Sequence, residues 1–461
     1  MSVEYACIMP HPPLIVPAVG RGEERGIAAT TAAMEYVSRQ IAAVKPDTIV
    51  LASPHSVMYA DYIHISPGAS ARGSFARFGA PQVSVEKEFD TELVEAIADL
   101  AFEEDLRAGT LGEKDASLDH GTLVPLYFIE QQIKDYKLVR VSLSGQPLIM
   151  HYRFGQLVAR AAKRLGRRIV FVASGDLSHR LKADGPYGYA PEGPEFDKRV
   201  TDAMKTGDFM AFLRMGESFC EAAGECGLRS FIEMAGALDG RAVTPDFRSY
   251  EGPFGVGYAV CGYAVDGPDE NRRFGQHYEE QRATELATIK AGEDAYVKLA
   301  RLSLETYVKT GKKAAMPDDL PEEMTTRRAG VFVSLKKDGR LRGCIGTISP
   351  TTVSIAEEIM NNAISAGTGD PRFEPVKEEE LPHLVYSVDV LSEPEPISSM
   401  DELDPKRYGI IVSKGYRRGL LLPNLEGVDT VRQQVDIALQ KAGIRPDESY
   451  SMERFEVVRH K

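Results

Sequence analysis

Short apolar runs followed by a histidine are the most regular feature of the first half of this chain. Runs at residues 5–9, 48–52 and 169–173 lead shortly afterwards to His11, His55 and His179. Apolar, often β-branched runs of this length that end at Pro, Gly or Ser are typical of buried strands in a mostly parallel sheet. Because ligands bind beyond the carboxyl ends of such strands, the pattern predicts one site shared by the histidines.

Strand-like and helix-like segments alternate up to about residue 266. Apolar residues recur at helical spacing between Ile27 and Val44, ahead of the strand that leads to His55. Further strands are expected at 62–66, 138–142 and 256–265, and further helices at 88–104, 123–133, 150–165 and 228–238. This alternation predicts an α/β fold with a mostly parallel or mixed sheet covered by helices.

A polar stretch that contains Gly267 and Pro268 predicts the end of the first domain. The expected division is a domain at 1–268, a linker at 269–284 and a second domain at 285–461. An amphipathic segment is expected at 280–308, and the Asp338-Gly339 pair predicts a type I′ hairpin. Strands at 384–391, 409–412 and 420–422 and a helix at 428–442 make the second domain a separate α+β domain.

Charge and cysteine content narrow the classes of function. The chain of 461 residues carries 55 basic and 68 acidic side chains, a net charge of −13, which argues against binding of nucleic acid. Five scattered cysteines without a CxxC pair fit reduced thiols rather than a disulfide framework. The chain also has no apolar run of 18 residues and no signal-peptide pattern, so we expect a cytoplasmic protein that does not enter a membrane.

The strand-end histidines favour a metal centre, since neutral imidazole is the commonest metal ligand in proteins. His11 and His55 are the leading candidates, and a third ligand is expected from Glu225 or the adjacent Cys226. Two histidines and a carboxylate form the facial triad of non-haem Fe(II) enzymes, whereas two histidines and a thiolate suit zinc or copper. A hydrogen-bonded surface role is the ordinary alternative for any one of these histidines.

Two more histidines are candidates for catalysis. His179 follows Asp176, which could orient its imidazole, and His120 follows Asp119 at the start of a helical stretch. Helix capping or turn formation is an equal alternative for the two aspartates.

Five segments together resemble the LigB-type class III extradiol dioxygenases and the related Memo proteins over residues 1–268. They are Pro10-His11-Pro12-Pro13, Ser53-Pro54-His55-Ser56, Asp119-His120-Gly121, Ser174-Gly175-Asp176-Leu177-Ser178-His179 and Gly224-Glu225-Cys226-Gly227. The dioxygenase resemblance implies Fe(II) on His11, His55 and Glu225, with His179 as acid/base and His120 as its helper. The Memo resemblance implies instead a cysteine near this point, with the position of His179 belonging to the metal site.

The second half resembles the AMMECR family over residues 285–461. The resemblance lies in three segments: Leu341-Arg342-Gly343-Cys344-Ile345-Gly346-Thr347, Asp370-Pro371-Arg372-Phe373 and Leu420-Leu421-Leu422-Pro423. Fusion of the two domains is similar to bacterial proteins named for association with a radical S-adenosylmethionine partner, which implies such a partner here.

These resemblances predict an Fe(II)-dependent extradiol dioxygenase that opens a catechol-like ring with O₂. The alternatives are a Memo-like protein that binds iron, copper or zinc and works with the radical partner, and a metal-dependent hydrolase that activates water on zinc. The sequence leaves the substrate, the metal and the oligomeric state open.

Overall fold

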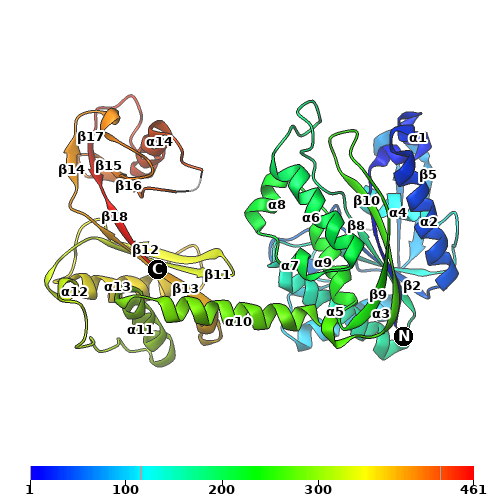
Figure 1. The fold of residues 1–461 in the computed structure, drawn as a ribbon, viewed down its shortest axis with the longest axis horizontal. Coiled ribbons are helices and arrows are strands. Elements are labelled where there is room, and N and C mark those ends of the chain that lie inside the picture. Colours follow the sequence, from blue (N-terminus) through cyan, green and yellow to red (C-terminus); the bar gives the residue numbers. More distant parts are fainter. Residues whose placement is uncertain (1, 115–116, 426) are drawn as a thin grey trace. The chain divides into compact units, whose positions relative to one another are not determined.

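The computed structural model describes residues 2–114, 117–425 and 427–461, and the chain divides into two compact units, Met1–Gln281 and Arg282–Lys461 (Figure 1). The expected linker at 269–284 is largely helical. It contains η4 (Glu270–Arg272) and the first half of α10 (Phe274–Gly292). The expected amphipathic segment at 280–308 is divided between α10 and α11 (Ala295–Thr310), because Asp294 caps a new helix there with its side chain.

Six strands form the main sheet of the first unit, in the order β7-β2-β8-β1-β10-β9. They are β1 (Val3–Met9), β2 (Thr48–Ser53), β7 (Lys137–Ser142), β8 (Ile169–Ser174), β9 (Arg241–Glu251) and β10 (Tyr258–Pro268). The first four strands of this order run parallel, whereas β10 is antiparallel to β1 and β9 is antiparallel to β10. The prediction of a mostly parallel or mixed sheet is therefore confirmed.

Helices cover both faces of this sheet (Figure 1). Successive residues of a strand face opposite sides, so each strand contributes side chains to the core on both faces. Ala6 and Ile8 of β1 belong to one hydrophobic cluster, and Cys7 and Met9 belong to the other. The first cluster includes residues of α3 (Thr91–Glu103), α5 (Leu148–Leu165), α6 (Glu192–Thr206) and α9 (Leu228–Ala237), and the second includes α2 (Ala28–Val44) and α4 (His120–Ile129). Three short helices complete the set: α1 (Pro17–Gly20), α7 (Met210–Leu213) and α8 (Glu217–Ala223).

The sequence predicted some strands of the first unit only in part and others not at all. The strand expected at 62–66 is only β3 (Ile63–His64), which pairs with β6 (Ala108–Gly109). The β4–β5 ribbon (Ser70–Phe75 and Ala80–Glu88) and the edge strand β9 were not predicted. Most residues of β9 are only partly buried, so they show neither a continuous apolar run nor a clean alternation.

The second unit contains two four-stranded antiparallel sheets, in the orders β12-β11-β13-β18 and β14-β17-β15-β16. The strands are β11 (Val331–Lys337), β12 (Arg340–Gly346), β13 (Leu384–Leu391), β14 (Glu395–Ile397), β15 (Gly409–Lys414), β16 (Arg417–Leu421), β17 (Ser451–Phe455) and β18 (Val457–His460). The helices are α11, α12 (Glu322–Thr326), α13 (Ile355–Thr368) and α14 (Val431–Ala442). Asp338 and Gly339 have φ values of 52° and 79°, as the predicted type I′ hairpin requires.

Two of the sequence segments singled out in this unit meet in space. The backbone N–H of Cys344 donates to Asp370 at 2.9 Å, and the Arg372 guanidinium donates to the carbonyl of Cys344 at 3.2 Å. Cys344 is partly exposed, and its thiol accepts a hydrogen bond from Ser334 at 3.2 Å.

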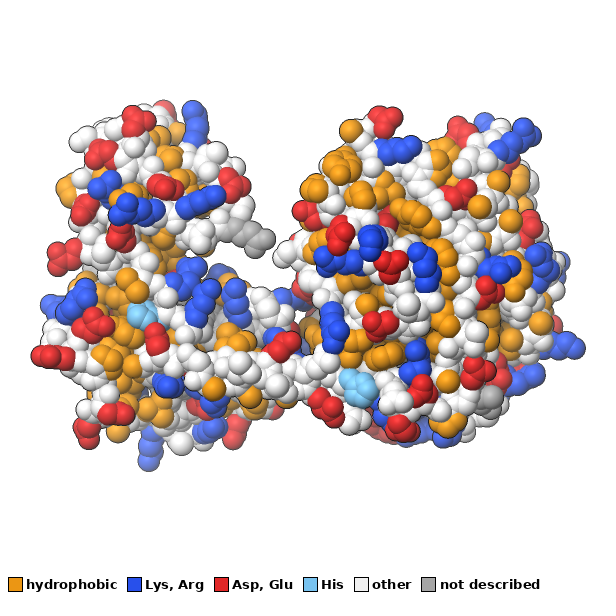
Figure 2. Space-filling model, in the orientation of Figure 1, with side chains coloured by type: hydrophobic (Ala, Val, Ile, Leu, Met, Phe, Trp, Pro, Cys, Tyr) orange, Lys and Arg blue, Asp and Glu red, His pale blue; other side chains and the backbone are white. Residues whose placement is uncertain are grey.

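On the face shown in Figure 2, basic and acidic side chains are interspersed over each unit. Among the helices of the residues described, none is both long and apolar enough to cross a membrane.

Candidate metal centre

The candidate site lies at the carboxyl edge of the main sheet. Strands β2, β8 and β1 are neighbours in the sheet, and each is followed within a few residues by one of the histidines singled out in the sequence. The parallel arrangement brings the Nε2 atoms of His11 and His55 within 3.0 Å of each other. The predicted convergence of these two histidines is therefore present in the fold.

Cys226 is the third potential ligand in the group. Its Sγ lies 3.7 Å from Nε2 of His11, and one ligand atom from each of the three residues lies within 4.8 Å of the others. His11 is buried, Cys226 is partly buried and His55 is exposed. The group is therefore closed on the side of His11 and accessible on the side of His55.

The tautomer of His11 follows from its hydrogen bonds. The Ser174 hydroxyl donates to the carbonyl of Gly121 at 2.6 Å, so its oxygen accepts from Nδ1–H of His11 at 2.9 Å. The lone pair of His11 is therefore on Nε2, which faces His55 and Cys226. A fixed tautomer of this kind is typical of metal-binding histidines, and Ser174 is a residue of the site that the sequence reading missed.

The spacing of these donor atoms fits one metal ion. Imidazole nitrogen and thiolate sulfur bind zinc at about 2.0–2.3 Å, so ligand atoms on one tetrahedral ion lie about 3.3–3.8 Å apart. The separations of 3.0 Å and 3.7 Å in this group are close to that range. Burial raises the pKa of the Cys226 thiol, and the nearby Asp176 and Glu225 carboxylates raise it further. A bound metal would have to displace the thiol proton.

Among the residues described, this group contains Cys226 and not Glu225, which the dioxygenase resemblance assigns as the third ligand. The Glu225 carboxylate accepts a hydrogen bond from the backbone N–H of Leu228 at 2.7 Å, at the start of α9. It lines a separate cavity of about 260 Å³ together with Cys220 and Arg229. Glu225 therefore satisfies the amino end of a helix, and the adjacent Cys226 faces the histidines.

His120 lies beside His11 and His55. Its ring stacks on that of His55 with centroids 4.1 Å apart, and the ring of Phe78 is 5.6 Å away. Burial lowers the pKa of His120 to about 4, and the charge of His55 acts in the same direction. His120 is therefore neutral near pH 7.

His179 faces the same region from the segment after β8. Its backbone N–H donates to the carbonyl of Gly224 at 3.1 Å, and the exposed Tyr187 lies 5.1 Å away, ring centroid to ring centroid. The Nε2 atom of His179 is buried and has no hydrogen-bond partner within the described part of the chain. Burial lowers the pKa of His179 to about 4, so its imidazole is neutral near pH 7 and able to accept a proton.

Asp119 has the helix-capping role that was the predicted alternative, whereas Asp176 makes a long-range bond that the sequence did not predict. Asp119 caps α4, because its carboxylate accepts from the backbone N–H of Thr122 at 3.0 Å. Asp176 accepts from the backbone N–H of His11 at 2.8 Å, and its other oxygen lies 3.9 Å from Nε2 of His11. Burial raises the pKa of Asp176 to about 7. Asp176 is therefore bonded to His11, and no hydrogen bond between Asp176 and His179 is seen among the residues described.

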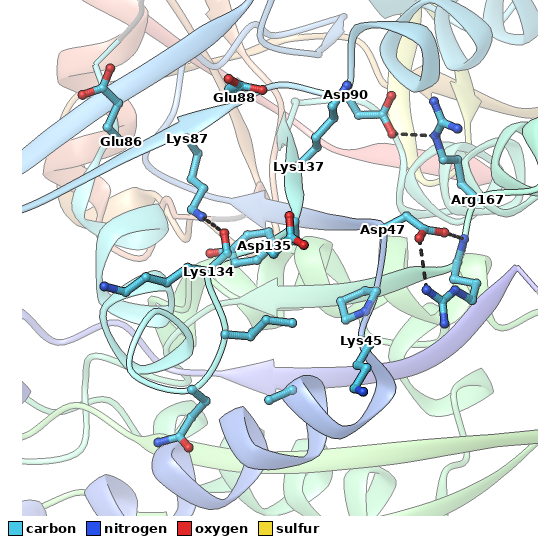
Figure 3. Close-up of a pocket in the computed structure, with 16 residues that line it drawn as sticks. Lys45, Asp47, Glu86, Lys87, Glu88, Asp90, Lys134, Asp135, Lys137 and Arg167 are labelled. Carbon is cyan, nitrogen blue, oxygen red and sulfur yellow. Dashed lines mark hydrogen bonds and ion pairs between the residues drawn. The ribbon is translucent and has the colours of Figure 1, made fainter.

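A larger pocket lies at the opposite end of the same sheet (Figure 3). Its volume is about 1060 Å³, and its lining includes Asp47 just before β2, Lys137 at the start of β7 and Arg167 just before β8. Asp47 pairs with Arg168 and Asp90 pairs with Arg167, so charges of both signs line it. Because it lies at the amino ends of the strands, this pocket is separate from the histidines at the carboxyl ends.

Comparisons with known proteins agree with the resemblances seen in the sequence. The family described as the catalytic LigB subunit of aromatic ring-opening dioxygenase matches residues 5–261, and the AMMECR1 family matches residues 297–460. Protein CA_C1420 of Clostridium acetobutylicum is 46% identical over the full length of both chains. A protein of Thermotoga maritima is 55% identical over 37% of this chain and 99% of its own length. The crystal structure of the uncharacterized protein PH0010 from Pyrococcus horikoshii is 36% identical, covers 36% of this chain and 88% of that chain, and gives a TM-score of 0.34.

Proposed function

From the premise that this chain belongs to the LigB family of aromatic ring-opening dioxygenases and carries an AMMECR1 domain behind it, we propose that the first unit is an Fe(II)-dependent extradiol dioxygenase acting on a catechol-like aromatic. The observation that carries this proposal is the pair of neutral histidines, His120 and His179, that lies beside the strand-end histidines. His11, His55 and Cys226 would hold the metal.

Iron bound there would supply open positions for the two catechol oxygens and for O₂. His179 accepts the proton of the second substrate hydroxyl at Nε2, which is its unpartnered nitrogen, and returns it as the ring opens. His120 stacks on His55 and helps to keep that ring in place. The exposed side of His55 is the side from which a substrate reaches the centre.

The test is anaerobic reconstitution with Fe(II), followed by oxygen-electrode assays on a panel of catechols. We expect O₂ uptake to accompany loss of the catechol, with iron bound at one ion per chain. Loaded protein that consumes no O₂ with any catechol would contradict the proposal.

His179→Gln provides a sharper test of the acid/base role. We expect this variant to bind the metal and still chelate a catechol, seen as a charge-transfer band, while turnover falls by about 10²–10⁴-fold. Loss of the metal itself would assign His179 to the metal site and favour the Memo-like alternative.

The second candidate is a Memo-like metal-binding protein that works with a radical S-adenosylmethionine partner. Cys226 favours it, because a thiolate with two imidazoles suits copper or zinc better than Fe(II). Competitive loading with Fe(II), Cu(I) and Zn(II) separates the candidates. Preferential binding of copper or zinc, without turnover of a catechol, would favour this second function.

A further inference from the structure

The segment that carries His179, residues 175–180, contains no helix or strand. It is fixed by backbone hydrogen bonds to two other loops. Leu177 N–H donates to the carbonyl of Gly257 and Gly257 N–H donates to that of Ser178, both at 2.8 Å. His179 N–H donates to the carbonyl of Gly224, close to Cys226 in the chain. The direction of the His179 side chain therefore depends on how firmly Ser178 is held.

Asp197 on α6 holds Ser178 directly. Its side chain is 1% exposed, and Oδ1 accepts the backbone N–H of Ser178 at 2.8 Å. The Ser178 hydroxyl in turn donates to the carbonyl of Ala223 at 2.7 Å. The residue before His179 is thus tied to α6 by its backbone and to the end of α8 by its side chain.

The second carboxylate oxygen of Asp197 is also fixed. Oδ2 accepts from the hydroxyl of Tyr250 on β9 at 2.7 Å, and Tyr250 is 42% exposed. A Cβ added to Gly257 would lie 2.1 Å from Oδ2, so only glycine permits this close approach. Ser178 from the segment after β8, and Tyr250 and Gly257 from the region of the β9–β10 connection, all converge on this one carboxyl group.

We infer that Asp197 is a positioning residue that aims His179 at the metal centre, with Tyr250 as the group that orients its carboxyl. This inference rests on the proposed function, because it depends on the role of His179 there. Asp197 itself does not belong to the group of potential metal ligands. Its effect on the reaction is through the backbone of Ser178, and a displacement of about 1 Å at a reacting group can cost about 10²-fold in rate.

The test compares Asp197→Ala with Asp197→Asn. The alanine variant leaves the Ser178 N–H without its acceptor, whereas the asparagine side chain offers an oxygen to Ser178 and an N–H to the Tyr250 hydroxyl. We expect kcat on a catechol to fall about 10- to 100-fold in Asp197→Ala with KM and bound metal unchanged, and to return to within about threefold of wild type in Asp197→Asn. Backbone amides of residues 177–180 should exchange faster in the alanine variant alone.

Two further variants keep the test decisive. Tyr250→Phe removes a hydrogen bond from a partly exposed residue, so it should fold normally and reduce kcat to a smaller extent. Asp202→Ala is the matched control, since Asp202 is an exposed residue of α6 that pairs with Lys198 and Lys205, and it should change neither kcat nor exchange. Unchanged kcat and exchange in both Asp197→Ala and Tyr250→Phe would overturn the inference, as would loss of the metal in Asp197→Ala.

A readout without turnover separates this inference from the proposed function. Diethyl pyrocarbonate modifies accessible neutral imidazoles, and peptide mapping gives its rate at His179. If no catechol is turned over by the wild type, the proposed function fails, while a changed rate at His179 in Asp197→Ala and not in Asp197→Asn still supports positioning. Equal rates in all variants would overturn it.

Discussion

At the scale of single residues, the site depends on which of two neighbours faces the histidines. Glu225 and Cys226 are adjacent, and only Cys226 belongs to the group with His11 and His55. Glu225 instead accepts from the N–H of Leu228. Adjacent side chains rarely point the same way, so the carboxylate that would complete an iron triad is directed elsewhere.

A pair of variants tests that choice. We expect Cys226→Ala to weaken metal binding by at least the 10- to 100-fold that changes outside the ligand set already cause. Glu225→Gln keeps an acceptor for the Leu228 N–H and changes no residue of the His11, His55 and Cys226 group. Its metal affinity should therefore stay within about threefold of wild type, well below the loss expected for Cys226→Ala. The affinities are measured by competition with a chromophoric chelator. The reverse pattern would restore Glu225 as the ligand.

Ser174 gives a second prediction at this scale. Its hydroxyl oxygen accepts a hydrogen bond from Nδ1–H of His11. Without that acceptor, His11 is no longer held in the tautomer that leaves Nε2 free to bind a metal, so Ser174→Ala should lower metal affinity about 10- to 100-fold. Ser142, the last residue of β7, is the matched control, because it occupies the same strand position but bonds the backbone of His64. Equal affinities of the two variants would contradict the role of Ser174.

Asp197 should make stability depend on pH. Burial raises its pKa from 3.8 to about 7, and hydrogen bonds from Ser178 and Tyr250 offset this in part. Between these values the folded chain retains a proton that the unfolded chain releases. The contribution of Asp197 to stability is therefore full below about pH 4 and is lost as the pH rises towards 7.

Comparison with Asp197→Asn isolates this contribution. The free energy of unfolding of the wild type, relative to that of the variant, should fall by about 4 kcal/mol between pH 4 and pH 8. Urea unfolding at several pH values measures it. A difference that does not change with pH would contradict the raised pKa.

At the scale of elements, single polar residues join helices to the sheet. Asp90 is the N-cap of α3, where it accepts the N–H of Leu93, and it also accepts the Thr48 hydroxyl of β2 and pairs with Arg167 before β8. One buried carboxylate therefore connects three segments at the amino end of the sheet.

Asp90→Ala should therefore lower the free energy of unfolding by more than the loss of an ordinary helix N-cap does. An N-cap is worth about 1 kcal/mol and a hydrogen bond to a charged group about 1.5–3 kcal/mol, so we expect a loss of about 2–4 kcal/mol. Asp99→Ala on the exposed face of the same helix is the control and should change stability by less than about 0.5 kcal/mol. Denaturant unfolding measures both, and equal losses would contradict the role of Asp90.

At the scale of the whole molecule, each unit has hydrophobic clusters of its own. Two clusters lie in the first unit and three in the second, and the boundary falls within α10, of which only Gly275 is classed as buried. Phe274 and Tyr278 pack against the core of the first unit, and the rest of the helix beyond them is exposed or only partly buried, as is typical of a connection between domains.

Limited digestion with trypsin should therefore cut within α10, at Arg282 or Lys290. We expect two products that each unfold cooperatively, with metal binding confined to the first, because His11, His55 and Cys226 all precede the cut. Calorimetry and metal analysis of the separated products check this. Unfolded products would show that the units depend on each other for stability.

Local pattern was enough to predict much of this protein. The apolar runs before His11 and His55 and after Arg168 became β1, β2 and β8, since burial on both faces of a parallel sheet requires continuous apolar sequence. The Asp338-Gly339 hairpin followed from backbone sterics alone. The rule that ligands collect at the carboxyl ends of strands then brought His11 and His55 together correctly.

Only the tertiary structure decided the remaining features of the site. Whether Glu225 or Cys226 faces the histidines depends on where α9 begins, and neither residue type nor spacing fixes that. The bond between Ser174 and His11 joins residues 163 positions apart, and that between Asp197 and Ser178 joins residues 19 positions apart. Strand and helix patterns reflect contacts between near neighbours and burial against a core, whereas these hydrogen bonds exist only once distant segments have packed together.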